Sequence, residues 1–334
     1  MKAERIGAWL LLVCATITIV GFSWDIQWHA DVGPDTFFTA PHLVMYLGTA
    51  TTGFTCLGVV LYRTFRRPDP AVRTVKVLGT FQAPIPFLVT GLGAAAELLY
   101  GLTDLWWHTV YGFDVTPTSP PHVAMSLCVL VEAIGAVMAF ASLRETRSGR
   151  VGLAVYVGLA TYGQVFLLLS TPALPWVREF FFAVALMGVL ALVLVAAVTR
   201  SPGLVVVTGL SYAVVHAVTW FTMPPLTRAY AASIDLPVRD YVDGTSVYAS
   251  FSPLVMLPAA LLMAGALALG KRFGSVKGAA MVAGVVGAAL LTLGYCVQYN
   301  VMDVVTIVVT AAFGVLIGLA AWRMSAPLRN LAEV

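Results

Sequence analysis

The sequence predicts an all-α fold, a polytopic bundle of transmembrane helices, from three observations. Of the 334 residues, 60% are hydrophobic and 10% are charged, whereas a soluble globular domain carries about 25% charged residues. The mean hydropathy is +0.90. About ten apolar runs approach the roughly 20 residues that a helix needs to cross a bilayer. This composition excludes a water-soluble enzyme, a disordered chain and a nucleic-acid-binding protein.

The expected spans follow one another along the whole chain. The first apolar run is expected to be retained, because no convincing small-x-small cleavage site follows it. Glycine and proline within the runs are tolerated, because neighbouring helices satisfy the backbone groups that a kink frees. The candidate spans lie near residues 6–24, 42–62, 77–101, 121–143, 151–170, 180–199, 204–222, 250–270, 278–296 and 304–322.

Basic residues are distributed unevenly between the two sets of segments that connect these spans. Of the 19 Lys and Arg residues, only Arg178, Arg228 and Arg239 fall on one side. Basic residues mark the cytoplasmic side of a membrane protein. The pattern therefore predicts an even number of spans, cytoplasmic N and C termini, and an outer side that carries few positive charges.

Two polar segments between spans repeat one pattern, which reads Asp-x-x-x-His, then Gly, Asp and a Pro-His pair, and ends with Met. Four of the five histidines occupy matching positions in the two copies, so coincidence is a poor explanation. The matched residues are Asp25 with Asp104, His29 with His108, Asp35 with Asp114, His42 with His122, and Met45 with Met125.

The repeat also divides the chain. Residues 1–145 form a four-span region that holds both copies, and residues 146–334 form a six-span region. A degenerate copy without the histidine is expected within 204–270.

The spacing of the repeat brings its polar side chains together. Residues four apart share one helix face, so Asp25 and His29 project together from the end of a span. Asp104 and His108 do the same in the second copy. Proline in the first turn starts the next helix and places His42 and His122 at its top. Each helical hairpin is thus expected to gather one carboxylate and two imidazoles near the outer membrane surface. Such a set binds a transition metal and leaves coordination positions open, without choosing among iron, copper and zinc.

The alternative is that these Asp and His side chains form hydrogen bonds between helices or cap helix ends. Asp35 and Asp114 either orient a metal-bound imidazole or form turns. Met45 and Met125 are expected to pack in the core, although methionine sulfur also binds copper.

Ionisable residues within spans are costly and tend to be functional. Glu97 lies two helical turns before Asp104 on the same face. It either belongs to a proton path to the metal or pairs with His216 or a hydroxyl. The ionisable residues that the sequence places within spans are Glu97, Glu132, His216 and Asp303.

The two copies resemble the C subunit of the copper membrane monooxygenases, the family of particulate methane monooxygenase and ammonia monooxygenase. That family has Asp-x3-His-x12-His and then Asn-x3-His-x13-His on successive hairpins. This chain has the same spacings in the same order, over about residues 20–130. It departs from the family at Asp104, where the family usually has Asn, and it has more spans than the family's C subunit.

The resemblance implies two metal sites, one made by Asp25, His29 and His42 and the other by Asp104, His108 and His122. It implies that the protein is an integral protein of a prokaryotic cell membrane, with its metal sites toward the outer face. Copper is the implied cofactor. The implied function is a monooxygenase, or the metal-binding subunit of one, that hydroxylates a small apolar substrate taken from the lipid bilayer. The implied partners are separate A- and B-type subunits, or further copies of the chain in a homo-oligomer.

Three other functions stay open at this point. A metal permease or chaperone needs a line of ligands across the membrane. A zinc-dependent membrane hydrolase needs a metal-bound water and a base such as Asp35 or Asp114. A scaffold subunit uses the sites only to stabilise its helical hairpins.

Overall fold

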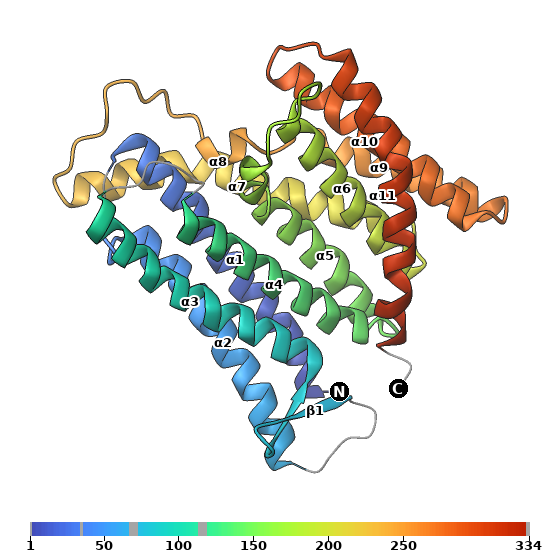
Figure 1. The fold of residues 1–334 in the computed structure, drawn as a ribbon, viewed down its shortest axis with the longest axis horizontal. Helices are drawn as coiled ribbons and strands as arrows, with labels where there is room; N and C mark the ends of the chain where they lie inside the picture. The colour runs from blue at the N-terminus through green and yellow to red at the C-terminus, as the bar shows by residue number, and fades with distance from the viewer. Residues whose placement is uncertain (1, 34–35, 67–72, 113–118, 332–334) are drawn as a thin grey trace. The chain divides into compact units, whose positions relative to one another are not determined.

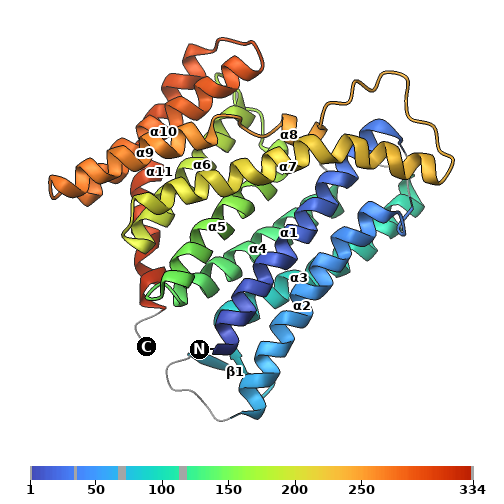
Figure 2. The same cartoon turned by 180° about the vertical axis from the view of Figure 1, so that it is seen from behind.

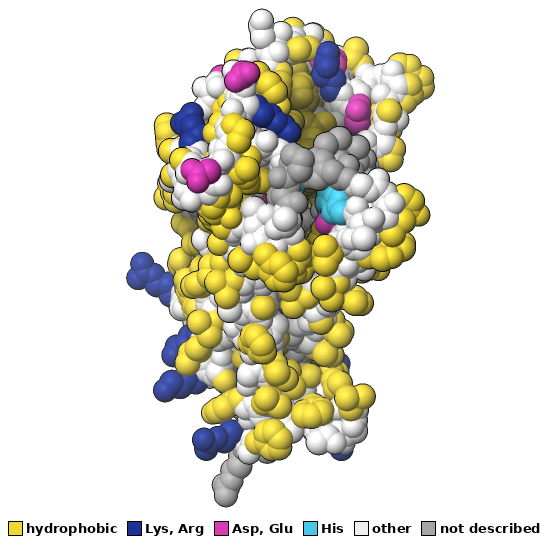
Figure 3. Space-filling model, turned by 90° about the vertical axis from the view of Figure 1, so that its left-hand side faces the viewer, with side chains coloured by type: hydrophobic (Ala, Val, Ile, Leu, Met, Phe, Trp, Pro, Cys, Tyr) yellow, Lys and Arg dark blue, Asp and Glu magenta, His cyan; other side chains and the backbone are white. Residues whose placement is uncertain are grey.

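The computed structural model describes residues 2–33, 36–66, 73–112 and 119–331. Within these residues, eight helices are long and apolar enough to cross a membrane. Hydrophobic side chains cover most of the surface seen in Figure 3. The prediction of an all-α bundle of transmembrane helices is confirmed, and the chain is an integral membrane protein.

The helices and one small hairpin follow one another along the chain (Figure 1). They are α1 (Lys2–Asp31), α2 (Ala40–Phe65), β1 (Thr74–Val77), β2 (Phe81–Pro84), α3 (Ile85–Tyr111), α4 (Pro120–Ser142), α5 (Arg147–Gly163), η1 (Phe166–Ser170), α6 (Glu179–Thr199), α7 (Gly203–Ser233), α8 (Val247–Ser250), α9 (Met256–Arg272), α10 (Val276–Gln298) and α11 (Val304–Asn330).

The structure differs from the expected spans in three places. The third span was expected to begin near residue 77, but α3 begins at Ile85, because residues 74–84 form an antiparallel β-hairpin. Its turn places Leu78 and Gly79 in succession at positive φ, a conformation that ends regular helix. The segments expected to cross at 151–170 and 250–270 form helices of 17 residues each, α5 and α9.

The chain forms two compact units. The first consists of residues 1–139 and 215–252, and the second consists of residues 140–214 and 253–334. Both copies of the repeat belong to the first unit. In that unit α1 packs on α2, and α2 packs on α3.

Glycines set the close approach of α1 and α2. A Cβ atom on Gly21 would lie 2.4 Å from the backbone nitrogen of Met45, and one on Gly48 would lie 2.6 Å from the backbone nitrogen of Thr18. Small residues at such positions let membrane helices approach until their backbones touch. The contact at Gly21 lies one turn from Asp25, so it fixes how closely the polar ends of the two helices meet.

In the second unit, α6 packs against α10 and α11. Its interface includes Phe181, which stacks on Tyr295 with ring centroids 4.9 Å apart. Asp303 was expected within a span, but it lies just before α11 as its N-cap. Its Oδ1 accepts a hydrogen bond from the Thr306 N–H at 2.9 Å, and its Oδ2 accepts one from the Thr306 hydroxyl at 2.7 Å.

This cap makes the start of α11 sensitive to acid. The Thr306 N–H that donates to Asp303 holds the pKa of that carboxyl below its ordinary value of 3.8. A depressed pKa in the folded state means that the ionised cap stabilises the fold above the ordinary value, and that this stabilisation is lost as the pH falls through the lowered pKa. We expect Asp303→Ala to cost about 1 kcal/mol at neutral pH.

Asn is as good an N-cap as Asp and does not titrate. Asp303→Asn is therefore expected to keep most of the stability at neutral pH and to lose the acid-dependent part. Thermal unfolding of both variants and the wild type, followed from neutral pH to below 3.8, measures this. Equal unfolding temperatures for the wild type and Asp303→Ala at neutral pH would show that the cap has no such role.

Candidate metal centre

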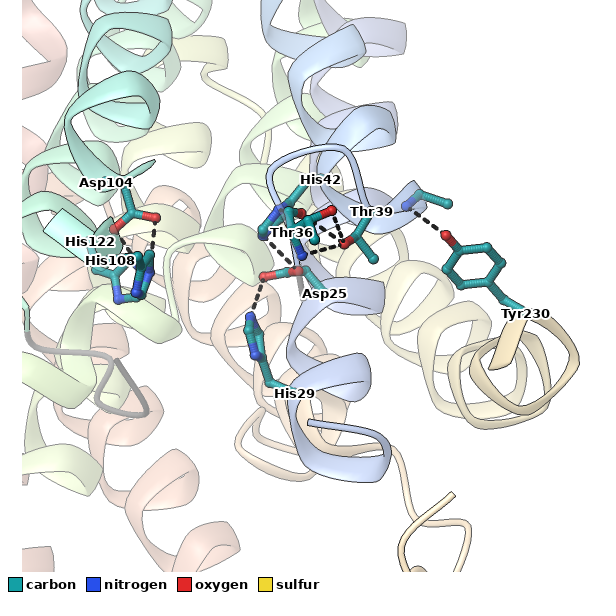
Figure 4. A network of polar contacts seen from close by, with 10 residues as sticks. Asp25, His29, Thr36, Thr39, His42, Asp104, His108, His122 and Tyr230 are labelled. Atoms are coloured by element: carbon teal, nitrogen blue, oxygen red, sulfur yellow. Dashed lines mark hydrogen bonds and ion pairs between the residues drawn. The ribbon is translucent and has the colours of Figure 1, made fainter. Parts of the chain in front are cut away.

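The first copy of the repeat forms a three-residue cluster where α1 ends and α2 begins (Figure 4). His29 Nε2 lies 3.6 Å from Asp25 Oδ2, and His42 Nε2 lies 3.1 Å from Asp25 Oδ1. The Asp25 carboxylate is buried, whereas 31% of the His29 side chain is exposed. The first cluster, Asp25, His29 and His42, therefore has a buried acid and one open side.

The second copy forms the same arrangement where α3 ends and α4 begins. His108 Nε2 lies 3.4 Å from Asp104 Oδ2, and His122 Nε2 lies 3.4 Å from Asp104 Oδ1. The carboxylate is again buried, and the two imidazoles are 28% and 26% exposed. Asp104, His108 and His122 are called the second cluster below.

The two clusters are nearly congruent. In each, one carboxylate offers one oxygen to each of two Nε2 atoms. The imidazole centroids are 6.3 Å apart with a 53° interplanar angle in the first cluster, and 6.1 Å apart with a 55° angle in the second. The agreement follows from the repeated spacing, because the same turn of helix and the same helix start build both. In the part of the chain that the structure describes, these are the groups of three or more potential ligands whose donor atoms all lie within 4.8 Å of one another.

Backbone carbonyls set the tautomer of one histidine in each cluster. His42 Nδ1 lies 3.1 Å from the Thr36 carbonyl oxygen, and His108 Nδ1 lies 3.2 Å from the Gly112 carbonyl oxygen. A carbonyl oxygen only accepts, so each Nδ1 carries the proton and donates it. In the neutral imidazole Nε2 then presents a lone pair toward the carboxylate. A positive charge, either a second proton on the ring or a metal ion, is needed to stabilise the contact.

The donor set fits a metal ion. Oδ1 of Asp25 and Oδ1 of Asp104 are both buried and accept no hydrogen bond from the described residues. His42 Nε2 lies 3.1 Å from Asp25 Oδ1, but with the proton on Nδ1 it has no hydrogen to donate. Ligands bound at about 2.0–2.2 Å lie roughly 3.0–3.6 Å from one another, which matches the nitrogen–oxygen distances in both clusters. The Nδ1 contacts to carbonyls are also typical of histidines that bind a metal through the other nitrogen.

The two clusters lie at the same end of the first unit. Helices α2 and α3 run antiparallel, with Gly91 against Cys56, Ala94 against Gly53 and Gly101 against Tyr46. One helical turn beyond the contact of Gly101 with Tyr46, the same pairing places His42 of α2 at the level of Asp104 of α3. His122 of the second cluster is also close enough to Asp25 for an electrostatic interaction. The clusters are therefore neighbours.

Sequence reasoning missed the segment between α7 and α8, which includes Arg239 and Thr245 and contacts the C-terminal end of α1 beside the first cluster. Arg239 donates through Nη1 to the carbonyl oxygens of His29 at 3.0 Å and Ala30 at 3.1 Å, and its backbone N–H donates to the Asp31 carbonyl at 2.8 Å. Gln27 binds the same segment, because its Nε2 donates to the Thr245 carbonyl at 3.1 Å. The carbonyls of His29, Ala30 and Asp31 belong to the last turn of α1, where the positive charge of Arg239 is favourable.

The C-terminal half of α7 passes beside the same end of α1 (Figure 2) and carries Tyr230, which packs on Trp28. Its ring centroid lies 5.0 Å from that of Trp28, and its hydroxyl accepts a hydrogen bond from the Ala40 N–H at 3.3 Å. This contact bridges the end of α1 and the start of α2. No local sequence signal marked either Arg239 or Tyr230, because the contacts join residues about 200 positions apart.

Removing the Arg239 side chain is expected to loosen the first cluster alone. Supporting hydrogen bonds around a metal site are worth about 10–100-fold in metal affinity, so we expect Arg239→Ala to weaken binding at the first cluster by that factor. The second cluster is the internal control. Isothermal titration with metal checks this, and equal weakening of both sites would contradict it.

The other residues singled out in the sequence fall elsewhere. Asp35 and Asp114 lie outside the described residues. Met45 is buried. Glu97 is buried and lies near Glu132 and Thr49. His216 stacks on Trp220, with ring centroids 5.8 Å apart, and belongs to neither cluster.

Comparison with known proteins adds nothing to this assignment. No family model, curated protein sequence or solved structure matches the chain.

Proposed function

We propose that this protein is a copper-dependent membrane monooxygenase, or the metal-binding subunit of one, which hydroxylates a small apolar substrate with dioxygen. The observation that carries the proposal is the pair of congruent clusters, each with one carboxylate, two Nε2 donors and an exposed side. Three donors leave coordination positions for other ligands. The repeated spacing that resembles the copper membrane monooxygenases favours copper over iron and zinc.

Bound copper supplies the redox chemistry that activates dioxygen. The residues of the chain hold and orient it. Asp25 and Asp104 each place one negative charge in a buried position, which favours a cation. A backbone carbonyl orients one histidine ring in each cluster. The more exposed imidazoles, His29, His108 and His122, lie on the side from which a substrate approaches.

Aromatic side chains beside the clusters support an apolar substrate. Phe37 stacks on Tyr46 with centroids 5.0 Å apart, and Tyr46 lies 6.0 Å from His42. Near the second cluster, Trp107 packs on Tyr111 at 4.4 Å. Figure 3 shows a histidine side chain at the surface of a face that is covered largely by hydrophobic side chains. An apolar molecule dissolved in the bilayer can reach such a surface without crossing a polar barrier.

The uneven distribution of basic residues supports an orientation with cytoplasmic termini and with both clusters toward the outer face of a prokaryotic cell membrane. The chain then works with separate A- and B-type subunits or as a homo-oligomer. The clustering of ligands at one end of the first unit favours a fixed site over a metal permease, which needs ligands spread across the membrane.

Turnover of butane by the protein in native-like lipid, loaded with copper and supplied with a reductant and isotopically labelled dioxygen, tests the proposal. We expect labelled oxygen in the alcohol product, and a loss of at least about a hundredfold in His29→Ala or His108→Ala. Full activity in both variants would overturn the proposal, as would tightly bound zinc with hydrolysis in the absence of oxygen.

A further inference from the structure

A pair of glutamates lies in the interior of the first unit, away from both clusters. The exposed fractions are 2% for Glu97 on α3 and 8% for Glu132 on α4. Their carboxyl groups lie close enough together to share a hydrogen bond. Gly93 makes this possible, because a Cβ at that position would lie 2.8 Å from Glu132 Cγ and 2.9 Å from the Glu132 backbone nitrogen. The two helices therefore approach closely where the acids meet.

A hydrogen bond between two carboxyl groups needs a proton on one of them, because a carboxylate only accepts. In the part of the chain that the structure describes, neither acid forms an ion pair with a basic side chain. The neighbours are instead the thiols of Cys14, Cys56 and Cys128. Two adjacent negative charges in such an apolar interior carry a large energetic penalty. The pair is stable when it shares one proton.

A further sign of function is that two oxygens of the pair have no other partner. Glu97 Oε2 and Glu132 Oε1 are both buried and accept no conventional hydrogen bond from the described residues. Most buried polar atoms in proteins have a hydrogen-bond partner. A proton held between these oxygens satisfies both of them.

Polar groups lie between this pair and the metal clusters. The Thr49 hydroxyl is fully buried on α2, donates to the Met45 carbonyl oxygen at 3.3 Å and lies near Glu97. One turn further along α2, the Tyr46 hydroxyl oxygen lies 3.1 Å from the position of a Cβ on Gly101. The ring of His42 follows, with its centroid 6.0 Å from that of Tyr46. On the facing helix, seven residues from Glu97 to Asp104 span about 10 Å.

We infer that Glu97 and Glu132 are a proton-sharing pair that delivers protons through Thr49 and Tyr46 to the metal clusters. The inference rests on the proposed monooxygenase function, in which one oxygen atom enters the substrate and the other leaves as water. That water takes two protons, and an external two-electron donor supplies the electrons. The O–H bond of Glu97 breaks as its proton moves to the Thr49 oxygen, whose own proton moves on. Glu132 then takes up a proton from the aqueous phase and passes it to Glu97, and a second such cycle delivers the second proton.

Infrared spectroscopy of the full-length, metal-free protein in lipid nanodiscs tests the shared proton without any need for activity. We expect a carbonyl band of a protonated carboxyl at neutral pH, shifted in heavy water. Glu97→Gln and Glu132→Gln keep the shape of the side chain and are each expected to remove or shift this band. Glu145→Gln is the control, because 68% of that side chain is exposed. The absence of the band, or its survival unchanged in both variants, would overturn the inference.

Activity of the copper-loaded protein tests the delivery. We expect Glu97→Gln to lower turnover about a hundredfold with unchanged copper content and an increased solvent isotope effect. Tyr46→Phe is expected to slow turnover while leaving the infrared band intact. Wild-type rates in both variants would overturn the delivery step. If the wild type binds no copper, the proposed function fails, and with it the delivery, whereas the infrared band still decides whether the proton is shared.

Discussion

Asp104→Ala is expected to remove one of two bound metal ions and to leave the other. Asp104 supplies an oxygen to each of the two Nε2 atoms of the second cluster at 3.4 Å, so its loss leaves two imidazoles without the negative charge that attracts the cation. We expect metal affinity at this cluster to fall by more than about a hundredfold. Loss of a hydrogen bond that only supports a metal ligand costs less, about 10–100-fold. Elemental analysis after dialysis measures the remaining ion.

The matched control is Asp104→Asn, which keeps an oxygen ligand in the same place and removes only the charge. We expect this variant to retain the second ion with reduced affinity. Asp25→Ala should show the complementary loss at the first cluster, and a variant with both replacements should bind no ion. Two ions retained in Asp104→Ala would mean that this carboxylate is not a ligand.

The second large effect is expected from a single methyl group between α1 and α2. In Gly21→Ala the new Cβ would lie 2.4 Å from the Met45 backbone nitrogen, so one helix must move. Overpacking of this kind costs about 1–3 kcal/mol. The shift separates Asp25 and His29 from His42, and we expect metal binding at the first cluster to be lost while the second is kept.

Gly58→Ala is the control on α2, because nothing lies within 4 Å of a Cβ at that exposed position. It should be neutral or slightly stabilising, since alanine favours helix over glycine by roughly 1 kcal/mol. Thermal unfolding and metal titration of the two variants separate packing from the general effect of the substitution. The account of the α1–α2 contact is wrong if Gly21→Ala and Gly58→Ala behave alike.

Much of the fold was predictable because membrane helices are long and apolar. The i, i+4 spacing of Asp25 and His29 was enough to place them on one helix face, and Pro41 beside His42 marked the start of α2. The β-hairpin was not predicted, because Val75 and Val77 belong to a short apolar run that suits a strand or a helix equally. A run that breaks at Ser252 and Pro253 likewise shortened α9.

The supporting parts of the site depend on contacts that no local pattern reveals. Glu97 and Glu132 are 35 positions apart on different helices, and only the packing at Gly93 shows that they meet. Arg239 lies in a polar segment of ordinary composition, yet it binds the end of α1. Periodicity predicts which face a residue occupies, but it carries no information about which helix covers that face.

Anomalous diffraction at the copper edge, from crystals of the copper-loaded protein, tests the central claim most directly. The account predicts two peaks per chain, each about 2.0–2.2 Å from two histidine Nε2 atoms and a carboxylate oxygen, one at His29 and His42 and one at His108 and His122. Diffraction with no peak at either cluster, or with the copper bound elsewhere, would contradict it.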